Sequence, residues 1–431
     1  MTKNGVFYSK NKLITFTSTI YNGTEGPNIF ILEERHMRQQ LMEKLEAKQD
    51  RIIEIRRYLH AHPELSFQEE NTARYIADFY EGKDCNVKTN IGGHGVVVTI
   101  DSGKPGRTLA IRADFDALPI TEETGLPFAS KNPGVMHACG HDGHTAYMLI
   151  LAETLIEMKD QLTGKIIVLH QPAEETPPGG AIAMIRDGCL DGVDHVLGIH
   201  VMSTMPTGEI LYREGATQTG RAAFKVKITG RGGHGSSPHM ANDAIVAASE
   251  FVLAIQTIIS RRLNPFDVGS ITIGSFDGKG SFNVIKDAVE LEGDVRAMTE
   301  ETRVLIEKEF RQILDGLAKM FGITYDLAYK NDYPVLVNDV NLTAFVATSL
   351  KDSNIHEVTA ISRCEQQSPS EDFAYYAKER PSTFFYVGAM PANGICYPHH
   401  HPKFDINEAS LLIAAKAMGT LVADYGNYKE E

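Results

Sequence analysis

The chain has 431 residues, a length that predicts two or three domains rather than one. Hydrophobic residues make up 42% and charged residues 23%, a balance typical of soluble globular proteins with a large core. Acidic residues outnumber basic ones by 56 to 42, and the formal net charge of −14 disfavours nonspecific binding to nucleic acid or to an anionic membrane. It does not exclude an anionic substrate, which needs only one or two local arginines.

The five cysteines are scattered and odd in number, which argues against a disulfide framework and for a reducing, cytoplasmic compartment. No stretch of about 20 apolar residues is present, so no membrane span is predicted. The apolar run "LITFTSTIY" near the N-terminus is too short and too rich in Thr and Ser for a signal peptide. We expect residues 1–36 to form an N-terminal extension.

The first half of the chain alternates helical and strand patterns. Leu41, Leu45 and Ile52 recur at helical spacing, which predicts a surface helix over 37–60. Further helices are expected over 69–80, 145–159 and 181–188. Strands are expected over 95–100, 108–118, the start of 164–175, and 193–201. This alternation predicts a mainly parallel α/β sheet covered on both faces, with the ligand site beyond the carboxyl ends of its strands.

The middle of the chain changes pattern and is predicted to be an inserted domain over 218–330. Its expected elements follow the order strand, helix, strand, strand, helix, strand, which is the ferredoxin-like (βαββαβ) arrangement. These elements lie at 223–230, 243–263, 270–276, 288–298, 300–321 and 323–329. Residues 37–217 and 331–431 would then form the main domain. Its last elements are expected at 339–351, 370–379, 382–389 and 407–425.

The segment "MHACGHDGH" (136–144) concentrates three histidines, a cysteine and an aspartate in nine positions. Cys139 and His141 lie just before a predicted helix, where the helix N-terminus favours a thiolate and a nearby dication favours it more. This density of ligand-type residues is compatible with a metal site, with a nucleophilic cysteine, or with neither.

Three other clusters lie at strand ends or in a loop near the same predicted edge. Glu174 and Glu175 are adjacent acids, which repel unless a cation neutralises one and leaves the other to act as a base. His200 ends a strand, and three consecutive histidines occupy 399–401. Cys, His, Glu, His and His would be enough ligands for two metals that activate a bridging water. Each residue alone is more often packed or solvated, so the prediction depends on the coincidence of all clusters at one edge.

An ordered series of motifs resembles the metal-dependent N-acyl amino acid amidohydrolases, within the wider aminoacylase and carboxypeptidase clan. This group includes hippurate hydrolases, auxin-conjugate hydrolases and N-acetyl-diaminopimelate deacetylases. The resemblance covers about residues 37–425, and the order of so many motifs makes it highly specific. The motifs are "RRYLHAHPELSFQE" (56–69), "RADFDALP" (112–119), "MHACGHDGH", "QPAEE" (171–175), "GIHV" (198–201), "GGHGSSPHMANDAI" (232–245), "FNVIKDAVELEGDVR" (282–296), "SEDFAYY" (370–376) and "HHPKFD" (400–405).

The resemblance implies a two-metal catalytic domain interrupted by a lid and dimerisation domain. It implies Glu174 as the general base. It also selects His400 from the three consecutive histidines, because the family pattern is one histidine, one residue, then proline. The implied metal ligands are Cys139, His141, Glu175, His200 and His400. A mixture of thiolate, imidazole and carboxylate suits zinc or manganese, with nickel or cobalt as alternatives.

The resemblance also implies substrate-binding residues in the inserted domain. His234 would reach the partner subunit's active site, and Asn283 and Arg296 are candidates for binding the substrate carboxylate. Asp114 and Asp116 would orient the metal ligands, although they could instead cap the turn after their strand.

The chain departs from the family pattern at two positions. Pro369 stands where relatives usually carry Gly, and Lys286 stands where Pro is usual. Neither is a proposed ligand, so the departures weaken inference about the substrate more than about the reaction class.

We therefore predict a cytoplasmic, homodimeric hydrolase that cleaves the amide bond of N-acyl amino acids. A dipeptidase or carboxypeptidase of the same clan is the nearest alternative. A cysteine hydrolase using Cys139 with His141 or His144 as base is a second alternative, and a non-catalytic relative that binds acylated amino acids or only metal is a third. No nucleic-acid or membrane partner is expected.

Overall fold

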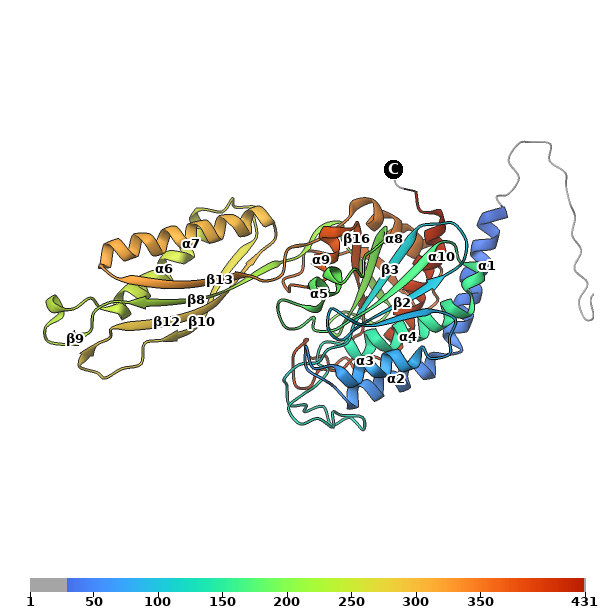
Figure 1. The fold of residues 1–431 in the computed structure, drawn as a ribbon, viewed down its shortest axis with the longest axis horizontal. Helices are drawn as coiled ribbons and strands as arrows, with labels where there is room; N and C mark the ends of the chain where they lie inside the picture. Colours follow the sequence, from blue (N-terminus) through green and yellow to red (C-terminus); the bar gives the residue numbers. More distant parts are fainter. Residues whose placement is uncertain (1–28, 430–431) are drawn as a thin grey trace, which may run out of the picture.

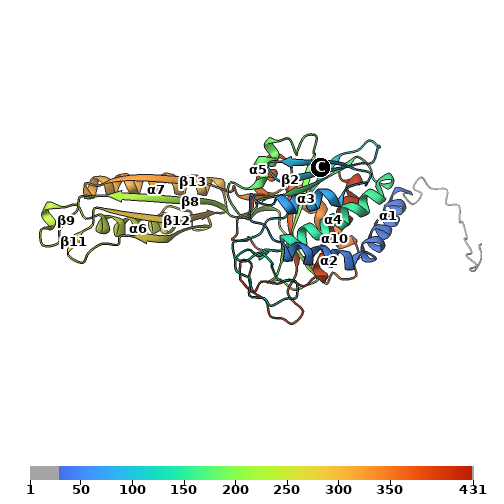
Figure 2. The ribbon, with the colours of Figure 1, turned by 60° about the horizontal axis from the view of Figure 1, so that its bottom comes forward.

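The computed structural model describes residues 29–429, which form a larger and a smaller part joined by two crossings of the chain. Figures 1 and 2 show the smaller part projecting from one end of the larger part. Most of the predicted extension, residues 1–28, lies outside the described residues, whereas residues 29–36 already belong to a helix.

The larger part is built on an eight-stranded mixed sheet in the order β1-β2-β4-β3-β5-β16-β6-β15. Four neighbouring pairs are parallel and three are antiparallel, so the expectation of a mainly parallel α/β sheet is confirmed. The antiparallel pairs involve β1, β2 and β6. The sequence patterns predicted β2 but not β1 or β6. The strands are β1 (Asn86–Ile91), β2 (Gly95–Asp101), β3 (Thr108–Asp114), β4 (Lys165–Gln171), β5 (His195–Met202), β6 (Glu209–Tyr212), β15 (Ala360–Arg363) and β16 (Ser382–Gly388).

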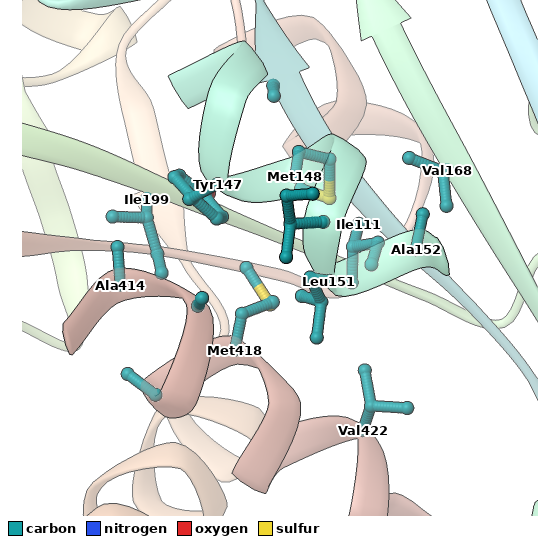
Figure 3. Packing of buried hydrophobic residues seen from close by; sticks show 14 of the residues in the cluster. Ile111, Tyr147, Met148, Leu151, Ala152, Val168, Ile199, Ala414, Met418 and Val422 are labelled. Carbon is teal, nitrogen blue, oxygen red and sulfur yellow. The ribbon is translucent and has the colours of Figure 1, made fainter. Parts of the chain in front are cut away.

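Helices cover both faces of this sheet. One face packs on α4 (His141–Glu157) and α10 (Ala409–Asp424), which are apolar on almost every side and therefore almost wholly buried. Figure 3 shows Met148 and Leu151 of α4 and Met418 of α10 packed beside Ile111 of β3. The other face carries the short helices α5 (Gly180–Arg186) and α9 (Ala374–Glu379). The larger part also contains α3 (Glu70–Phe79) and α8 (Val340–Asp352).

The predicted single helix over 37–60 is wrong, because the structure contains two helices there. α1 (Ile29–Glu46) packs on α10, and α2 (Gln49–Ala61) packs on α4. The chain turns at Ala47 and Lys48 between them. The apolar spacing is nearly continuous across the break, so the sequence pattern alone did not reveal it.

The smaller part follows the element order β8-α6-β10-β12-α7-β13, with an antiparallel sheet in the order β10-β12-β8-β13. Phe224, Phe251 and Phe310 meet edge to face where both helices pack on the sheet, and this core is separate from those of the larger part. The elements are β8 (Gly220–Thr229), α6 (Ala244–Arg261), β10 (Gly269–Asp277), β12 (Ala288–Ala297), α7 (Glu300–Phe321) and β13 (Thr324–Asn331).

Within the described residues, α6 is the one helix that is long and apolar enough, by length and composition, to cross a membrane. Its inward side chains, including Phe251 and Ile255, form part of the core of the smaller part. Only a third of the helix is buried, and Ile245, Val246 and Leu253 are exposed. α6 therefore carries more apolar side chains than are buried by packing within this chain.

The two crossings between the parts run side by side. β7 (Gly215–Gln218) precedes the smaller part, β14 (Leu336–Asn338) follows it, and the two strands pair antiparallel. At the far tip of the smaller part, β9 (Gly233–His234) pairs with β11 (Val284–Ile285) (Figure 2). The smaller part thus has a paired two-strand connection at one end, here called the hinge together with its flanking residues, and a short two-stranded element at the other.

Candidate metal centre and substrate cavity

The predicted site residues gather at the carboxyl ends of β3, β4 and β5. Asp114 is the last residue of β3, "PAEE" follows β4, and His200 lies near the end of β5. Several of the predicted residues border a cavity of about 390 Å³ that extends from this edge of the sheet to the hinge. The lining side chains include Cys139, Glu174, Glu175, His200, Arg296 and His400.

Three overlapping groups of donor atoms meet in this cavity. Within each group, one donor atom of every residue lies within 4.8 Å of the others. The groups are Cys139 with His141 and His200, Cys139 with Glu175 and His400, and His141 with Glu174 and Glu175. Because Cys139, His141 and Glu175 each belong to two groups, the structure brings all five predicted ligands and the predicted base into one cluster.

Hydrogen bonds orient two imidazoles with a free lone pair toward this cluster. His141 Nδ1 lies 3.0 Å from the main-chain oxygen of Asp116, and His200 Nδ1 lies 2.8 Å from that of Val201. Each Nδ1 must therefore carry the proton, which leaves Nε2 as a ligand atom. His141 Nε2 is buried and has no hydrogen-bond partner, and His200 Nε2 lies 3.5 Å from the sulfur of Cys139.

The three consecutive histidines have different surroundings. His400 Nε2 lies 3.2 Å from Glu175 Oε1. His399 uses Nδ1 with the main-chain oxygen of Cys139 and Nε2 with the main-chain N–H of Ser203, so both of its nitrogens are occupied. His401 accepts a hydrogen bond from the main-chain N–H of Lys403 and stacks on the ring of Tyr397. Of the three histidines, His400 is the one that joins a donor group with Cys139 and Glu175.

The environment of Cys139 is unfavourable for a thiolate without a cation. Burial raises the pKa of its thiol well above the usual value, and the carboxylates of Glu175 and Glu174 raise it further. A nucleophilic cysteine requires the opposite shift, whereas a bound dication would deprotonate the sulfur outright. This argues against the alternative in which Cys139 acts with a histidine base.

Glu174 has the environment of a proton carrier. Burial raises the pKa of its carboxyl well above the usual value, and the neighbouring carboxylates of Glu371 and Glu175 add to the effect. Its side chain is almost completely buried but lines the cavity. A carboxyl group that binds a proton readily and faces the substrate space can act as a general base and then as an acid.

Asp114 and Asp116 lie directly behind the cluster. Asp116 Oδ1 lies 3.2 Å from His141 Nδ1, and its Oδ2 accepts hydrogen bonds from the main-chain N–H of Glu175 at 2.9 Å and from Ser66. Asp114 accepts from His144 Nδ1 at 2.6 Å, while His144 Nε2 accepts from the main-chain N–H of Val201. Both nitrogens of His144 are therefore occupied, and this residue is not available as a metal ligand or as a base.

Arg112, Glu371 and Asp372, which form a buried ion network with the predicted Asp114, were not among the predicted functional residues. Arg112 donates to Asp114 at 2.5 Å, to Glu371 at 3.0 Å and to Asp372 at 3.0 Å, and all four side chains are buried. Both halves of the network lie in motifs that signalled the family, "RADFDALP" and "SEDFAYY". Residue spacing could not show that positions 112 and 371 meet, so this assignment required the fold.

The three predicted substrate-binding residues lie in two different places. Arg296 lines the cavity together with Arg221, and the Nε atoms of both arginines lie within 2.8 Å of the carboxylate of Asp294. His234 and Asn283 are exposed, do not line the cavity, and lie at the β9–β11 tip of the smaller part. Within one chain, the structure therefore brings only Arg296 to the cluster.

The donor set is suited to a pair of divalent cations. It combines a thiol, carboxylates and two imidazoles whose Nδ1 atoms lie next to main-chain oxygens, which leaves Nε2 of each for a cation. Zinc accepts all three ligand types, and imidazole and carboxylate also suit manganese, nickel and cobalt. The orphaned His141 Nε2 and the closely spaced Glu174 and Glu175 carboxyls would both be satisfied by cations.

Comparison with known proteins gives a consistent assignment. The chain is 43% identical over 390 residues to the Bacillus subtilis protein YhaA, which is named as an amidohydrolase, and this covers 90% of the chain and 98% of YhaA. It is 36% identical over 392 residues to the N-acetyl-L-cysteine deacetylase of Bacillus subtilis, covering 91% of each chain. It is also 36% identical over 395 residues to thermostable carboxypeptidase 1 of Saccharolobus solfataricus, covering 90% and 99%.

Solved structures agree with these relatives. A protein from methicillin-resistant Staphylococcus aureus, named as an aminohydrolase, has a TM-score of 0.87 and 66% identity, covering 90% of this chain and all of that chain. The YXEP protein of Bacillus subtilis, described as a dinuclear metal-binding peptidase, has a TM-score of 0.77 and 31% identity, covering 89% and 100%. A model of peptidase family M20/M25/M40 matches residues 110–424, so the chain belongs to this family.

Proposed function

We propose that this enzyme hydrolyses the amide bond of N-acyl amino acids with the help of two divalent metal ions. The observation that carries the proposal is the cluster of Cys139, His141, Glu175, His200 and His400, with Glu174 beside it in a cavity that also contains Arg296. When bound there, the cations would lower the pKa of a water molecule and polarise the amide carbonyl.

The residues of the chain divide the remaining tasks. Glu174 takes the proton of the attacking water and passes it to the leaving nitrogen, a role supported by its raised pKa and its position on the cavity wall. Asp116 holds His141 and the Glu175 backbone in place, and Asp114 fixes His144 behind them. Arg296 offers a planar guanidinium for the free carboxylate of the substrate.

We propose that residues 218–330 form a ferredoxin-like lid and dimerisation domain on a catalytic domain formed by 37–217 and 331–431. Two observations support a homodimer. The first is the exposed apolar face of α6, with Ile245, Val246 and Leu253. The second is the position of His234 and Asn283 at the tip of the smaller part, where they could serve only the cavity of another subunit. Closure of such a lid would exclude water from the reaction.

The native metals are proposed to be zinc or manganese, with nickel or cobalt as alternatives. A cytoplasmic location is proposed on the basis that all five cysteines are free thiols. Carboxypeptidase or dipeptidase activity is the second candidate, supported by the similarity to thermostable carboxypeptidase 1. A carboxylate-binding arginine would serve either type of substrate.

The substrate class is tested by measuring amine release from a panel of N-acyl amino acids and a matched panel of dipeptides. We expect kcat/KM to be higher for the N-acyl amino acids, and a preference for dipeptides would favour the second candidate. The role of Glu174 is tested with Glu174→Gln. This variant should lose at least about a hundredfold in kcat and keep its metal content, because only the proton carrier is removed. Near-normal turnover would place the base elsewhere.

A further inference from the structure

Tyr333 lies on the return crossing from the smaller to the larger part and reaches the segment that carries the proposed base. Its side chain is 3% exposed and lines the cavity. Its hydroxyl donates a hydrogen bond of 2.6 Å to the main-chain oxygen of Glu174, which is 159 positions earlier in the sequence. A residue of the hinge is therefore in direct contact with the peptide that holds the proposed base.

The other contacts of this segment come from the larger part. Ala173 adopts a positive φ of 54°, a conformation that residues other than glycine rarely take. Its N–H donates to Glu69 at 2.8 Å, and its main-chain oxygen accepts from the N–H of Gly180. The N–H of Glu175 donates to Asp116 at 2.9 Å. The peptide that joins Glu174 to Glu175 is thus held at its carbonyl by Tyr333 of the hinge and at its N–H by Asp116, whereas the peptides before it are held by the larger part alone.

The backbone of Tyr333 is hydrogen-bonded to the smaller part. Its main-chain oxygen accepts a hydrogen bond of 2.8 Å from the N–H of Arg221 at the start of β8, and Arg303 Nη1 of α7 lies 3.3 Å from the same oxygen. A rotation of the smaller part would carry these anchors with it. Because the phenol ring is rigid, such a rotation would displace the hydroxyl relative to Glu174.

We propose that Tyr333 is a positioning residue that couples the orientation of the smaller part to the orientation of Glu174. The inference rests on the proposed function, since it assumes that Glu174 is the base. With the smaller part placed as in this structure, the hydroxyl of Tyr333 holds the Glu174 peptide and limits the directions in which its carboxyl can point. A change in the hinge would release this contact and change the orientation of the base, while Asp116 still holds the N–H of Glu175.

Tyr375 provides a matched control. Its hydroxyl donates a hydrogen bond of 2.6 Å to the main-chain oxygen of Asp332, the residue before Tyr333. The two phenol rings pack edge to face with centroids 6.3 Å apart. Tyr375→Phe therefore removes the same kind of hydrogen bond from the same hinge, but it leaves the contact with Glu174 intact.

The experiment measures kcat, KM and metal content of the full-length, metal-loaded enzyme with the best N-acyl amino acid from the panel. For Tyr333→Phe we expect kcat to fall at least about tenfold, with KM within about threefold and unchanged metal content. For Tyr375→Phe we expect kcat within about twofold of wild type. The inference is overturned if Tyr333→Phe keeps a normal kcat, if both variants lose activity equally, or if the loss follows loss of metal.

Two further variants keep the outcomes separable. If Glu174→Gln retains normal turnover, the proposed function fails. If Glu174→Gln is inactive and Tyr333→Phe is normal, only the present inference fails. Should Tyr333→Phe not fold, 4-aminophenylalanine at position 333, which keeps an N–H donor, is expected to give a kcat within about threefold of wild type. Folded, metal-loaded enzyme with a kcat tenfold lower would then overturn the inference.

Discussion

Asp116→Asn should weaken metal binding although Asp116 is not itself a proposed ligand. The Asp116 carboxylate faces only donors, namely His141 Nδ1, the main-chain N–H of Glu175 and the hydroxyl of Ser66. Asparagine has the same shape but carries an amide NH₂ in place of one oxygen. In either orientation of the amide, an N–H group must face another N–H group. One of the two ligand residues therefore loses its support.

The expected loss of metal affinity depends on which hydrogen bonds Asp116→Asn preserves. Loss of a group that orients a metal ligand typically costs 10- to 100-fold in metal affinity, or about 1.4–2.8 kcal/mol. His141 Nδ1 also lies 3.0 Å from the main-chain oxygen of Asp116, which the substitution preserves. The tautomer of His141 is therefore kept, and we expect a loss near the lower limit, about tenfold in affinity.

The assay is competition for metal between the protein and a chelator of known affinity. Ser66→Ala is the matched control, because it removes a hydrogen bond to the same carboxylate oxygen without touching a ligand, and its metal affinity should change less than about threefold. If Asp116→Asn binds metal as tightly as wild type, or if Ser66→Ala is equally weakened, Asp116 does not support the site as described.

Three further predictions address the metals, the pH dependence of folding and the dimer. Removal of metal by chelation and dialysis should abolish activity and metal addition should restore it, as followed by amine release; activity that survives dialysis would favour a cysteine nucleophile. Burial disfavours the charged form of Glu153, but hydrogen bonds from Arg51 and Lys83 outweigh it and lower the pKa to about 2. This pair network therefore stabilises the fold above about pH 4.5, and its contribution is lost as the pH falls toward 2. In thermal melts, the difference in Tm between wild type and Glu153→Gln should shrink between pH 5 and pH 3, and a constant difference would contradict this. Leu253→Asp on α6 should yield monomers in light scattering, whereas Val304→Asp, equally exposed at 67% but on α7, should not; monomeric wild type would exclude the proposed interface.

Much of the site could be predicted because its residues follow local rules. Cys139, Glu175 and His200 each lie where an apolar strand ends or a buried helix begins, and such positions meet at one edge of an α/β sheet. The choice of His400 came from the family pattern, and the structure adds a physical reason, since the nitrogens of His399 are occupied by backbone groups.

The parts that could not be predicted depend on contacts between distant segments. The contact of Arg112 with Glu371 spans 259 positions, and that of Tyr333 with Glu174 spans 159, so neither leaves a periodic signal in the sequence. At the break between α1 and α2 the main packing partner changes from α10 to α4, and the apolar spacing is similar on both sides. Tertiary packing decided these features rather than local preference.

The most direct test of the central claim is anomalous X-ray diffraction from crystals of the enzyme loaded with zinc or manganese. The account predicts two metal peaks about 3.5–4 Å apart, bound by Cys139, His141, Glu175, His200 and His400. A single peak, or two peaks away from these side chains, would contradict it.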